Sequence, residues 1–441
     1  MTELYRLTAA DLEESTRRAA GWLAARGVAA GDRVVVAARN HPATLAVAQG
    51  ALRSGVVPVL VSPELPPDER DWIVGDARPA VVVDDPAEAS RDGRPAGGLA
   101  DLPLGRPMFY TSGTSGRRKG VWSGVLDEST ATEWAADEQE LWAPVDGMSF
   151  LVCSPLSHSA GYRAATAALL ADATVLLLDR FDAASVVRLL AEDEVTGTFF
   201  VPTHLRRIVA LGDDLPRPRD ARRVLHAGEP CPEDVKRRAV RWLEPGELWE
   251  FYGSTEGQFT AISPAEWSTR PASVGRARPG RQLAIADPGD DGVGTVFVTA
   301  PPFARWEYWG DPAATAAAWR GDAFTAGDLG RLDVEGYLFL VARRDDLIIS
   351  GGVNVYAAEV ERTLLAHPSV EEAVVFGVPD DDWGQRVTAV VAARATTEAE
   401  LNSWARERLE PAHRPKSIEV RETLPRTSTG KIDRRALRPP R

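Results

Sequence analysis

The stretch Met-Phe-Tyr-Thr-Ser-Gly-Thr-Ser-Gly-Arg-Arg-Lys-Gly, residues 108–120, is the most informative part of the sequence. It combines a short apolar run with closely spaced glycines, hydroxyl side chains and a lysine. Glycine lets backbone N–H groups approach an anion, hydroxyls donate hydrogen bonds and lysine adds positive charge. The stretch therefore predicts a polyphosphate-binding loop that contains Thr111, Ser112, Gly113, Thr114, Ser115, Gly116 and Lys119. It does not fit the GxxxxGK[ST] loop, because Gly120 follows the lysine, and a flexible surface loop is the alternative.

Three later segments carry related chemistry. Residues 251–257, FYGSTEG, offer an aromatic ring, a hydroxyl and a carboxylate within five residues. Residues 326–330, AGDLG, place a carboxylate on a glycine-flanked turn that suits a sugar diol, and residues 424–432, LPRTSTGKI, place a lysine directly after a glycine. Each segment alone is weak evidence, because core packing would explain Tyr252 and a surface turn would explain Asp328.

Apolar runs of strand length alternate with helical patterns along the chain, which is typical of parallel strands covered by helices. The runs comprise residues 34–38, 56–61, 81–83, 173–178, 197–201 and 224–227. A charged break at residues 343–346 precedes a smaller α/β unit of about a hundred residues. The sequence predicts an α/β protein with a large N-terminal domain of helix-covered sheets, residues 1–343, and a small C-terminal α/β domain, residues 344–441.

Composition narrows the function classes. The chain has 441 residues and a formal net charge of −13, which argues against a general nucleic-acid binder. No apolar run of about 18 residues suggests a membrane span, and the acidic N-terminus does not resemble a signal peptide. With only two cysteines, a disulfide framework is not expected, so a cytoplasmic protein is predicted. Residues 411–441 carry nine Lys/Arg and three Asp/Glu, so this tail is either a solvated basic segment or a partner for an anionic ligand.

In their order and spacing, the four segments resemble the adenylate-forming superfamily of acyl-CoA synthetases, stand-alone adenylation domains and luciferases. Residues 155–161 (PLSHSAG) and 224–230 (VLHAGEP) support the resemblance, which covers nearly the whole chain. The likeness is greatest to actinobacterial fatty-acyl and aryl acyl-CoA synthetases. It implies ATP-dependent activation of a carboxylic acid to an acyl-adenylate with release of pyrophosphate, followed by transfer to the thiol of CoA with release of AMP.

The resemblance also implies roles for individual residues. The loop from Thr111 to Lys119 would hold the ATP phosphates, and the C-terminal domain would be mobile about a hinge at Asp345. The other implied residues are Gly228, Glu229, Pro230, Tyr252 and Gly253 for adenine; Asp328 and Arg343 for ribose; Thr255 for the α-phosphate; Glu256 for Mg²⁺; Lys431 for adenylation; and Gly351 and Gly352 for a pantetheine tunnel.

The same resemblance places the acid pocket around His158, which would lie beside the carboxylate as a catalytic residue; a surface histidine is the alternative. Ser159 stands where amino-acid-activating domains usually have an aspartate, so an α-amino acid is disfavoured, because a buried ammonium would lack a partner. The aromatic residues suggest a small apolar or aryl acid, although core packing explains them equally well. The expected pocket comprises Ser159, Ala160, Gly161, Phe200, Trp249 and Phe251.

Three function classes remain open at this stage. The first is an acyl- or aryl-CoA ligase, and the second is an adenylating enzyme with another acceptor, such as a carrier-protein thiol or an amine, or one that activates another small oxyanion. The third is a luciferase-like oxygenase or a non-catalytic nucleotide binder, which the presence of Glu256 and Lys431 opposes. Arg118, Ala342 and Ala357 depart from residues common in the superfamily, which leaves the rate and the substrate open.

Overall fold

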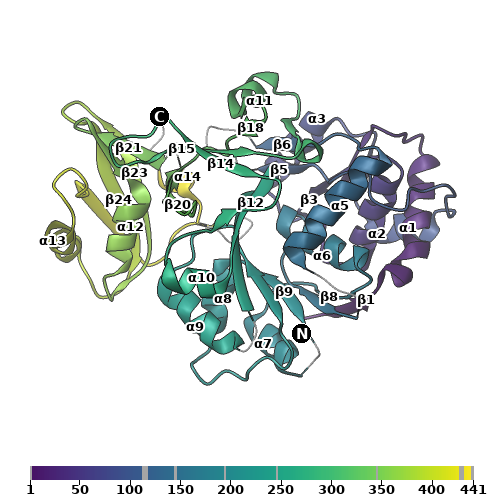
Figure 1. The fold of residues 1–441 in the computed structure, drawn as a ribbon, viewed down its shortest axis with the longest axis horizontal. Helices are drawn as coiled ribbons and strands as arrows, with labels where there is room; N and C mark the ends of the chain where they lie inside the picture. The colour runs from purple at the N-terminus through teal and green to yellow at the C-terminus, as the bar shows by residue number, and fades with distance from the viewer. Residues whose placement is uncertain are drawn as a thin grey trace. The chain divides into compact units, whose positions relative to one another are not determined.

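The computed structural model of the chain describes residues 2–111, 118–143, 147–192, 195–244, 247–343, 346–426 and 432–438. Seven predicted site residues lie outside this part of the chain: Ser112, Gly113, Thr114, Ser115, Gly116, Asp345 and Lys431. The chain divides into two compact units (Figure 1). Unit 1 comprises Met1–Leu283, Val298–Phe324 and Gly336–Leu338, and unit 2 comprises Ala284–Phe297, Thr325–Glu335 and Phe339–Arg441. This division is not a single cut in the chain, so the boundary between residues 343 and 344 stays a prediction.

Unit 1 is built on an eight-stranded mixed sheet. Its strands, in spatial order, are β1 (Leu4–Leu7), β8 (Thr174–Leu178), β7 (Ser149–Val152), β9 (Gly197–Phe200), β10 (Arg223–His226), β11 (Glu247–Ser254), β12 (Gly257–Ile262) and β13 (Arg276–Ala277). The strands from β8 to β11 run parallel to one another, whereas β1, β12 and β13 pair antiparallel to their neighbours. The antiparallel additions mean that the sheet is not wholly of the parallel type that the apolar runs suggested.

Helices cover both faces of this sheet (Figure 1). Successive strand residues point to opposite faces, so Phe150 and Val152 of β7 enter one core while Leu151 enters the other. The helices of unit 1 are α1 (Ala9–Ala24), α2 (Pro42–Arg53), α3 (Pro67–Ala77), α4 (Pro86–Asp92), α5 (Glu128–Trp142), α6 (Ser159–Leu170), α7 (Ala183–Glu192), α8 (Pro202–Val209), α9 (Glu233–Leu243), α10 (Pro264–Thr269) and α11 (Pro312–Ala318). Apolar residues of α1, α2 and α6 fill the first core, and those of α7, α8 and α9 fill the second.

Unit 1 also contains two three-stranded sheets. The first is the parallel sheet β3 (Val57–Val61), β2 (Arg33–Ala37) and β4 (Val81–Val83), which was predicted from its apolar runs. The second is the antiparallel sheet β16 (Glu307–Tyr308), β6 (Lys119–Trp122) and β5 (Phe109–Thr111). Unit 1 also contains the one-turn helix η1 (Pro302–Ala304) and the short strands β17 (Trp319–Arg320) and β18 (Ala323–Phe324).

Unit 2 contains a five-stranded sheet with its own apolar core. The strands are β22 (Val353–Tyr356), β21 (Leu347–Ser350), β24 (Gly384–Ala393) and β23 (Val370–Asp380), with β25 (Ser417–Arg421) also paired to β24. Its helices are α12 (Ala357–Leu365), α13 (Glu398–Arg408) and α14 (Arg434–Leu437). The remaining strands are β14 (Gln282–Ala286), β15 (Gly294–Thr299), β19 (Asp328–Leu332) and β20 (Leu338–Arg343), and the division between the units falls within β14, β15 and β20. The predicted fold class, α/β with a large N-terminal and a small C-terminal part, is confirmed.

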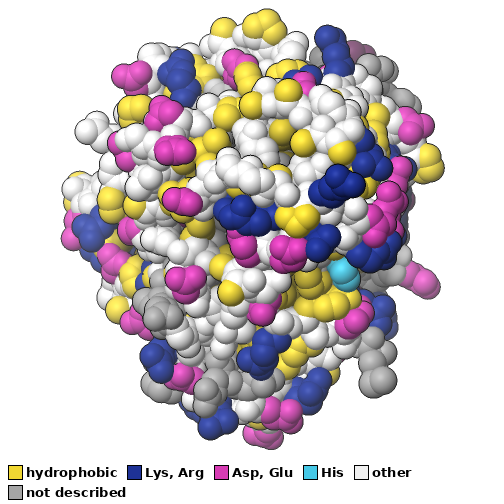
Figure 2. All heavy atoms as spheres, turned by 90° about the vertical axis from the view of Figure 1, so that its right-hand side faces the viewer, with side chains coloured by type: hydrophobic (Ala, Val, Ile, Leu, Met, Phe, Trp, Pro, Cys, Tyr) yellow, Lys and Arg dark blue, Asp and Glu magenta, His cyan; other side chains and the backbone are white. Residues whose placement is uncertain are grey.

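No helix among the described residues is long and apolar enough to cross a membrane. On the face drawn in Figure 2, acidic and basic side chains are interspersed.

A buried ion pair joins helices α5 and α6 to strand β12. Arg163 donates two hydrogen bonds to the carboxylate of Glu138, one of them 2.8 Å long, and a third to the Gln258 side chain. Trp142 donates a further hydrogen bond of 3.1 Å to Glu138. Only 5% of the Arg163 side chain and 2% of the Glu138 side chain are exposed. Both charges are therefore compensated inside the protein, where water cannot replace a lost partner.

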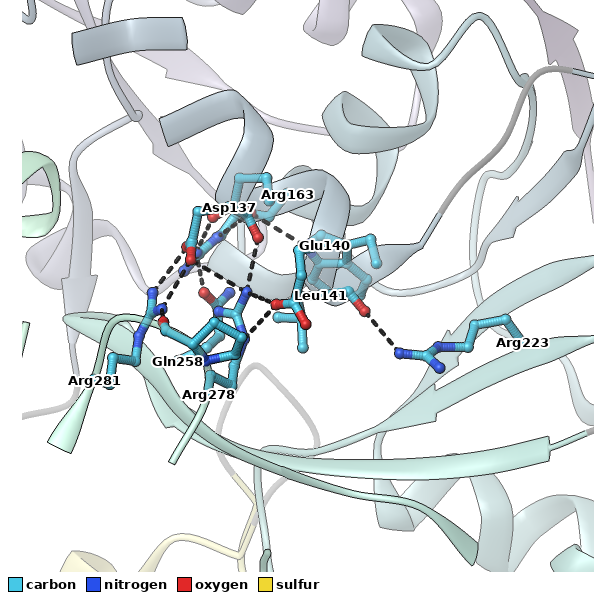
Figure 3. Close-up of polar contacts among 11 residues, drawn as sticks. Asp137, Glu140, Leu141, Arg163, Arg223, Gln258, Arg278 and Arg281 are labelled. Atoms are coloured by element: carbon cyan, nitrogen blue, oxygen red, sulfur yellow. Dashed lines mark hydrogen bonds and ion pairs between the residues drawn. The ribbon is translucent and has the colours of Figure 1, made fainter. Parts of the chain in front are cut away.

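Further arginines extend this network from the loop that follows β13 (Figure 3). Both Nη atoms of Arg281 bond the Asp137 carboxylate at 2.8 Å, and Arg278 bonds Glu140 at 2.7 Å. Burial alone would raise the pKa of the Asp137 carboxyl, but Arg281 and Arg278 hold it below its usual value. Helix α5 is thereby fixed through ion pairs on two successive turns.

We predict that Arg163→Met lowers the free energy of unfolding of unit 1 by about 3–5 kcal/mol, because the carboxylate of Glu138 stays buried without its cation. The matched control is Arg188→Met on α7, where an exposed pair with Glu192 at 3.7 Å contributes less than about 1 kcal/mol. Denaturant unfolding of both variants measures the difference. Equal midpoints for the two variants would contradict the assigned importance of the buried pair.

Candidate active site

The polyphosphate loop predicted from the sequence joins two paired strands. Thr111 ends β5 and lies directly opposite Lys119, the first residue of β6. A Cβ atom at Gly120 would come within 3.0 Å of the Met108 sulfur and 3.1 Å of the Tyr110 ring, so a side chain there would disturb the hairpin. The hairpin therefore holds both ends of the loop a few ångströms apart, although the loop residues between them are not described.

Lys119 and Glu256 converge on the same tyrosine. The Nζ atom of Lys119 lies 4.9 Å from the centre of the Tyr308 ring and 3.7 Å from a carboxylate oxygen of Asp311. The Tyr308 hydroxyl donates a hydrogen bond of 2.8 Å to Oε1 of Glu256, which is buried. An ammonium over the ring and a carboxylate at the hydroxyl, from separate sequence motifs, thus contact one phenol side chain.

Thr255 and Glu256 form the two-residue turn between β11 and β12, because Ser254 pairs with Gly257. A Cβ atom at Gly253 would lie 2.5 Å from the carbonyl oxygen of Gly257, so this close approach of backbone requires glycine. The turn places the side chains of these two predicted site residues beyond the hydrogen-bond ladder.

The remaining predicted adenine residues lie near the ends of β10 and β11. Tyr252 is half-buried, and its ring packs edge-on against Phe259 with centroids 5.1 Å apart. Gly228 has a φ of +99°, which favours glycine, and Pro230 is exposed. The Glu229 carboxylate accepts two hydrogen bonds from Thr203, 2.9 Å from its backbone N and 2.6 Å from its hydroxyl. Glu229 therefore fixes the first turn of α8 as well as lying in the predicted nucleotide segment.

His158 is half-buried and occupies the N-terminal cap position of α6, followed by half-buried Ser159 and Ala160. Gly161 is buried, and a Cβ atom there would lie 2.5 Å from the carbonyl oxygen of Pro155. This glycine thus has a packing role in the close approach of α6 to the preceding loop. Its predicted role in lining the acid pocket stays a prediction.

The aromatic residues predicted for the acid pocket have different surroundings. Phe200 and Phe251 are buried in the two cores of unit 1. Trp249 is partly buried, donates a hydrogen bond of 2.6 Å to Glu247, and lies under the Arg223 guanidinium at 4.0 Å. All three have structural contacts that do not require a ligand, so their pocket role stays a prediction.

In unit 2, the two residues predicted to hold ribose lie together. Asp328 begins β19 and Arg343 ends the neighbouring strand β20. The Nε atom of Arg343 lies 3.1 Å from Oδ1 of Asp328, whose side chain is 9% exposed. The carboxylate is therefore fixed by an ion pair.

Gly351 and Gly352 form the turn of the β21–β22 hairpin, because Ser350 pairs with Val353. Their φ angles of +59° and +80° match a two-residue type I′ turn, which requires positive φ at both central positions. A Cβ atom at Gly351 would come within 2.9 Å of the Trp383 ring, whereas one at Gly352 would meet nothing within 4 Å. The hairpin turn therefore gives these glycines a structural role, in addition to their predicted role in the pantetheine tunnel.

The comparisons with known proteins decide the family. Residues 2–100 and 107–305 match the family model described as AMP-binding enzyme, and residues 359–431 match that of the AMP-binding enzyme C-terminal domain. The chain belongs to the AMP-binding enzyme family. The predicted resemblance to adenylate-forming enzymes is confirmed.

Three curated relatives in this family are CoA synthases or ligases. A feruloyl-CoA synthase of Amycolatopsis sp is 34% identical, with 97% of this chain and 92% of the relative covered. A 2-succinylbenzoate–CoA ligase of Geobacillus kaustophilus is 31% identical (98% and 92%), and the long-chain-fatty-acid–CoA ligase FadD13 of Mycobacterium tuberculosis is 30% identical (98% and 93%).

Solved structures of AMP-binding enzymes share the fold. The o-succinylbenzoate CoA synthetase of Bacillus subtilis, in complex with an acyl-adenylate intermediate, superimposes with a TM-score of 0.86 at 27% identity, covering 98% of this chain and 93% of that one. The ATP-bound MatB of Rhodopseudomonas palustris gives 0.84 at 26% identity, covering 97% and 92%.

Arg118, which departs from the residue common in the superfamily, has an acidic partner in the structure. The guanidinium of Arg118 contacts the Glu69 carboxylate of α3 at 2.7 and 2.9 Å. This residue therefore anchors the end of the loop that precedes Lys119. Ala357 is buried at the start of α12, where it packs in the core of unit 2.

Sequence reasoning missed Tyr308 and Asp311. They lie far along the chain from both Lys119 and Glu256, and no local spacing relates them to either motif. The only signal was the aromatic cluster Trp306, Tyr308 and Trp309, which is typical of a packed core.

Among the described residues, no group of three or more His, Cys, Asp or Glu could hold a metal ion by itself. A single carboxylate such as Glu256 nevertheless suits Mg²⁺, which is usually bound by one or two carboxylates together with substrate phosphates.

Proposed function

We propose that the protein activates an apolar acyl or aryl carboxylic acid with ATP, releases pyrophosphate, and transfers the acyl group to CoA with release of AMP. The observation that carries the proposal is the convergence of Lys119 and Glu256 on Tyr308 in a member of the AMP-binding enzyme family. Together they provide a cation for phosphate oxygens and a buried anion for Mg²⁺.

The chemistry explains why both charges are needed. The carboxylate of the acid must approach a phosphate that is already anionic, and two unit charges about 4 Å apart repel by about 4 kcal/mol at an effective dielectric constant of about 20. Lys119 and Lys431 would offset this repulsion, and Thr255 would donate to the α-phosphate. Mg²⁺ held by Glu256 would neutralise charge on the phosphates. His158 would lie beside the acid, and Glu229, Tyr252 and Asp328 would hold the nucleoside.

The second half-reaction needs different residues at the same site. A thiol attacks the acyl carbonyl and AMP leaves. This step needs a channel for pantetheine and no longer needs residues that hold a polyphosphate. Rotation of residues 344–441 about Asp345 would withdraw Lys431 and bring in Gly351 and Gly352. The alternative acceptor is a carrier-protein thiol or an amine, since a phosphopantetheine arm could use the same channel.

The cysteines support a cytoplasmic location. Neither Cys153 nor Cys231 forms a disulfide, and burial raises the pKa of the Cys153 thiol to about 12. Protonated free thiols suit a reducing compartment.

Pyrophosphate release across a panel of carboxylic acids, with and without CoA, tests the proposed function. We expect release with at least one apolar or aryl acid, and CoA should then convert the adenylate to a thioester and AMP. If the adenylate accumulates and CoA does not discharge it, the ligase proposal fails in favour of another acceptor. If no acid releases pyrophosphate, acid activation itself is wrong.

We predict that Lys431→Ala slows adenylation by about 10²–10³-fold, because it removes about 3–4 kcal/mol of charge stabilisation from the transition state. Thioester formation from preformed acyl-adenylate should stay close to the wild-type rate. Single-turnover measurements of each half-reaction check this, with Arg421→Ala in the same basic tail as the control. Equal losses in both half-reactions would instead make Lys431 a structural residue.

We predict that Glu256→Gln raises the Mg²⁺ concentration that gives half-maximal adenylation by at least about 10-fold, because one anionic ligand is lost while the shape is kept. The matched control is Glu307→Gln, which changes an exposed carboxylate beside Tyr308. A Mg²⁺ titration that is unchanged in Glu256→Gln would assign this residue to the Tyr308 hydrogen bond alone.

A further inference from the structure

Arg106 is a buried cation with an unsatisfied donor. It lies just before β5 and is only 7% exposed. Its Nε donates a hydrogen bond of 3.0 Å to the Ser123 hydroxyl, while its Nη2 has no hydrogen-bond partner among the described residues. A buried guanidinium normally has an anionic partner, because burial in a less polar medium strongly disfavours an isolated charge.

The charges of Glu138, Asp137 and Glu256 act favourably on Arg106, but each of these carboxylates has another partner, which for Glu256 is the Tyr308 hydroxyl. Glu138 binds Arg163 and Trp142. Asp137 binds Arg281 (Figure 3). No carboxylate of the described chain lies within ion-pair distance of Arg106. Burial, and secondarily the charge of Arg163, lower the pKa of Arg106 to about 10, so the guanidinium is still charged at neutral pH.

Arg106 borders a small cavity of mixed polar and apolar lining in unit 1. The cavity is lined by Arg106 and Arg163, by the hydroxyl residues Ser123, Ser159 and Thr255, and by Phe109 among its apolar residues. Its volume is about 10 Å³, which is room for about one water molecule or one ligand oxygen. A whole phosphate or carboxylate group is too large for it, so the cavity can receive only a single oxygen of a bound molecule.

The walls of the cavity connect it to the proposed reaction. Ser159 belongs to the predicted acid pocket, and Thr255 is predicted to contact the α-phosphate. Arg163 comes from the same face of α6, one turn after Ser159. An oxygen that reached Arg106 would therefore belong to a molecule bound beside both of these residues.

We propose that this cavity receives one oxygen of a second carboxylate on the substrate acid, so that the protein prefers a dicarboxylic acid over its monocarboxylic counterpart. The proposal rests on the proposed function and names the substrate class for the same site. A carboxylate oxygen compensates the charge of Arg106 and accepts from Nη2, whereas a water molecule would satisfy only the hydrogen bond. The rest of the acid can stay apolar or aromatic.

The test compares matched acids. A series of dicarboxylic acids of increasing length, aliphatic and aryl, is assayed by pyrophosphate release, each beside the acid in which a methyl group replaces the second carboxylate. A hydroxyl-terminated acid separates the effect of charge from that of a neutral acceptor. For the best pair, we expect wild-type kcat/KM to favour the dicarboxylic acid by at least about 100-fold, because a site built for a buried hydrogen bond rejects an analogue without it.

Arg106→Met should reduce this preference to within about threefold. Arg106→Lys should retain part of the preference, since lysine keeps the positive charge but lacks the planar set of N–H donors of arginine. The control is Arg53→Met, which removes another largely buried guanidinium, ion-paired with Glu13 at 2.6 Å, and should leave the preference unchanged. The inference is overturned if no dicarboxylic acid is preferred, which means that water alone fills the cavity. It is also overturned if Arg106→Met lowers kcat/KM for both members of a pair equally.

Calorimetric binding of the same acids without nucleotide separates this inference from the proposed function. If no acid releases pyrophosphate, acid activation is wrong, yet dicarboxylate binding that is lost in Arg106→Met would still establish the site. Equal binding of both members of each pair would refute it. Should Arg106→Met not fold, Arg106→Gln supplies the same comparison, because it keeps a polar side chain beside Ser123.

Discussion

The ion pair between Arg163 and Glu138 is the interaction on which the arrangement of the site in unit 1 depends. Glu138 lies on α5 and Arg163 on α6, and the hydrogen bond from Arg163 to Gln258 adds the first part of β12. Gln258 follows the Thr255–Glu256 turn by two residues, so the position of that turn is linked to the helix that begins at Ser159. In a buried setting, each of these groups depends on its partner, because neither charge can turn to water instead.

Strand pairing is a second constraint, and it explains where the predicted functional residues lie. Thr255 and Glu256 are in a hairpin turn, Lys119 begins a strand, and Gly351 and Gly352 form a second hairpin turn. Side chains at such ends lie outside the strand ladder, and the paired strands fix their position. Glycines with positive φ or with a close backbone contact make these turns possible, which is why glycine-rich segments coincide with the chemistry.

The periodic parts of the fold could be predicted from the sequence, because their signals are local. The apolar runs predicted at residues 173–178 and 197–201 are strands β8 and β9, each of which is one residue shorter than its run. The β5–β6–β16 sheet was not predicted, since its strands are short and β16 lies far along the chain from β5 and β6. The β11–β12 hairpin was not predicted either, because its turn lies within the FYGSTEG segment, which was interpreted for its chemistry. Within the site, the motifs identified Lys119 and Glu256, but Tyr308 joins them from a separate part of the chain. Arg106 has no recognisable motif, and only its burial without a carboxylate distinguishes it.

The basic tail has a structural explanation that its composition did not indicate. Four of its arginines form ion pairs within unit 2: Arg421 with Glu419, Arg426 with Glu372, Arg434 with Glu361, and Arg438 with Asp346. Burial raises the pKa of the Glu361 carboxyl, while Arg434 opposes that rise by stabilising the charged form. Part of the positive charge in the tail is therefore paired with acidic residues of unit 2 and is not available to a ligand. Arg426 and Arg434 stand on either side of Lys431 in the sequence, so both flanks of the segment that carries this lysine are attached to unit 2. A lysine carried in this way would move with unit 2 as a body, and such attachment is what a domain rotation needs to bring it to the substrate and to withdraw it again.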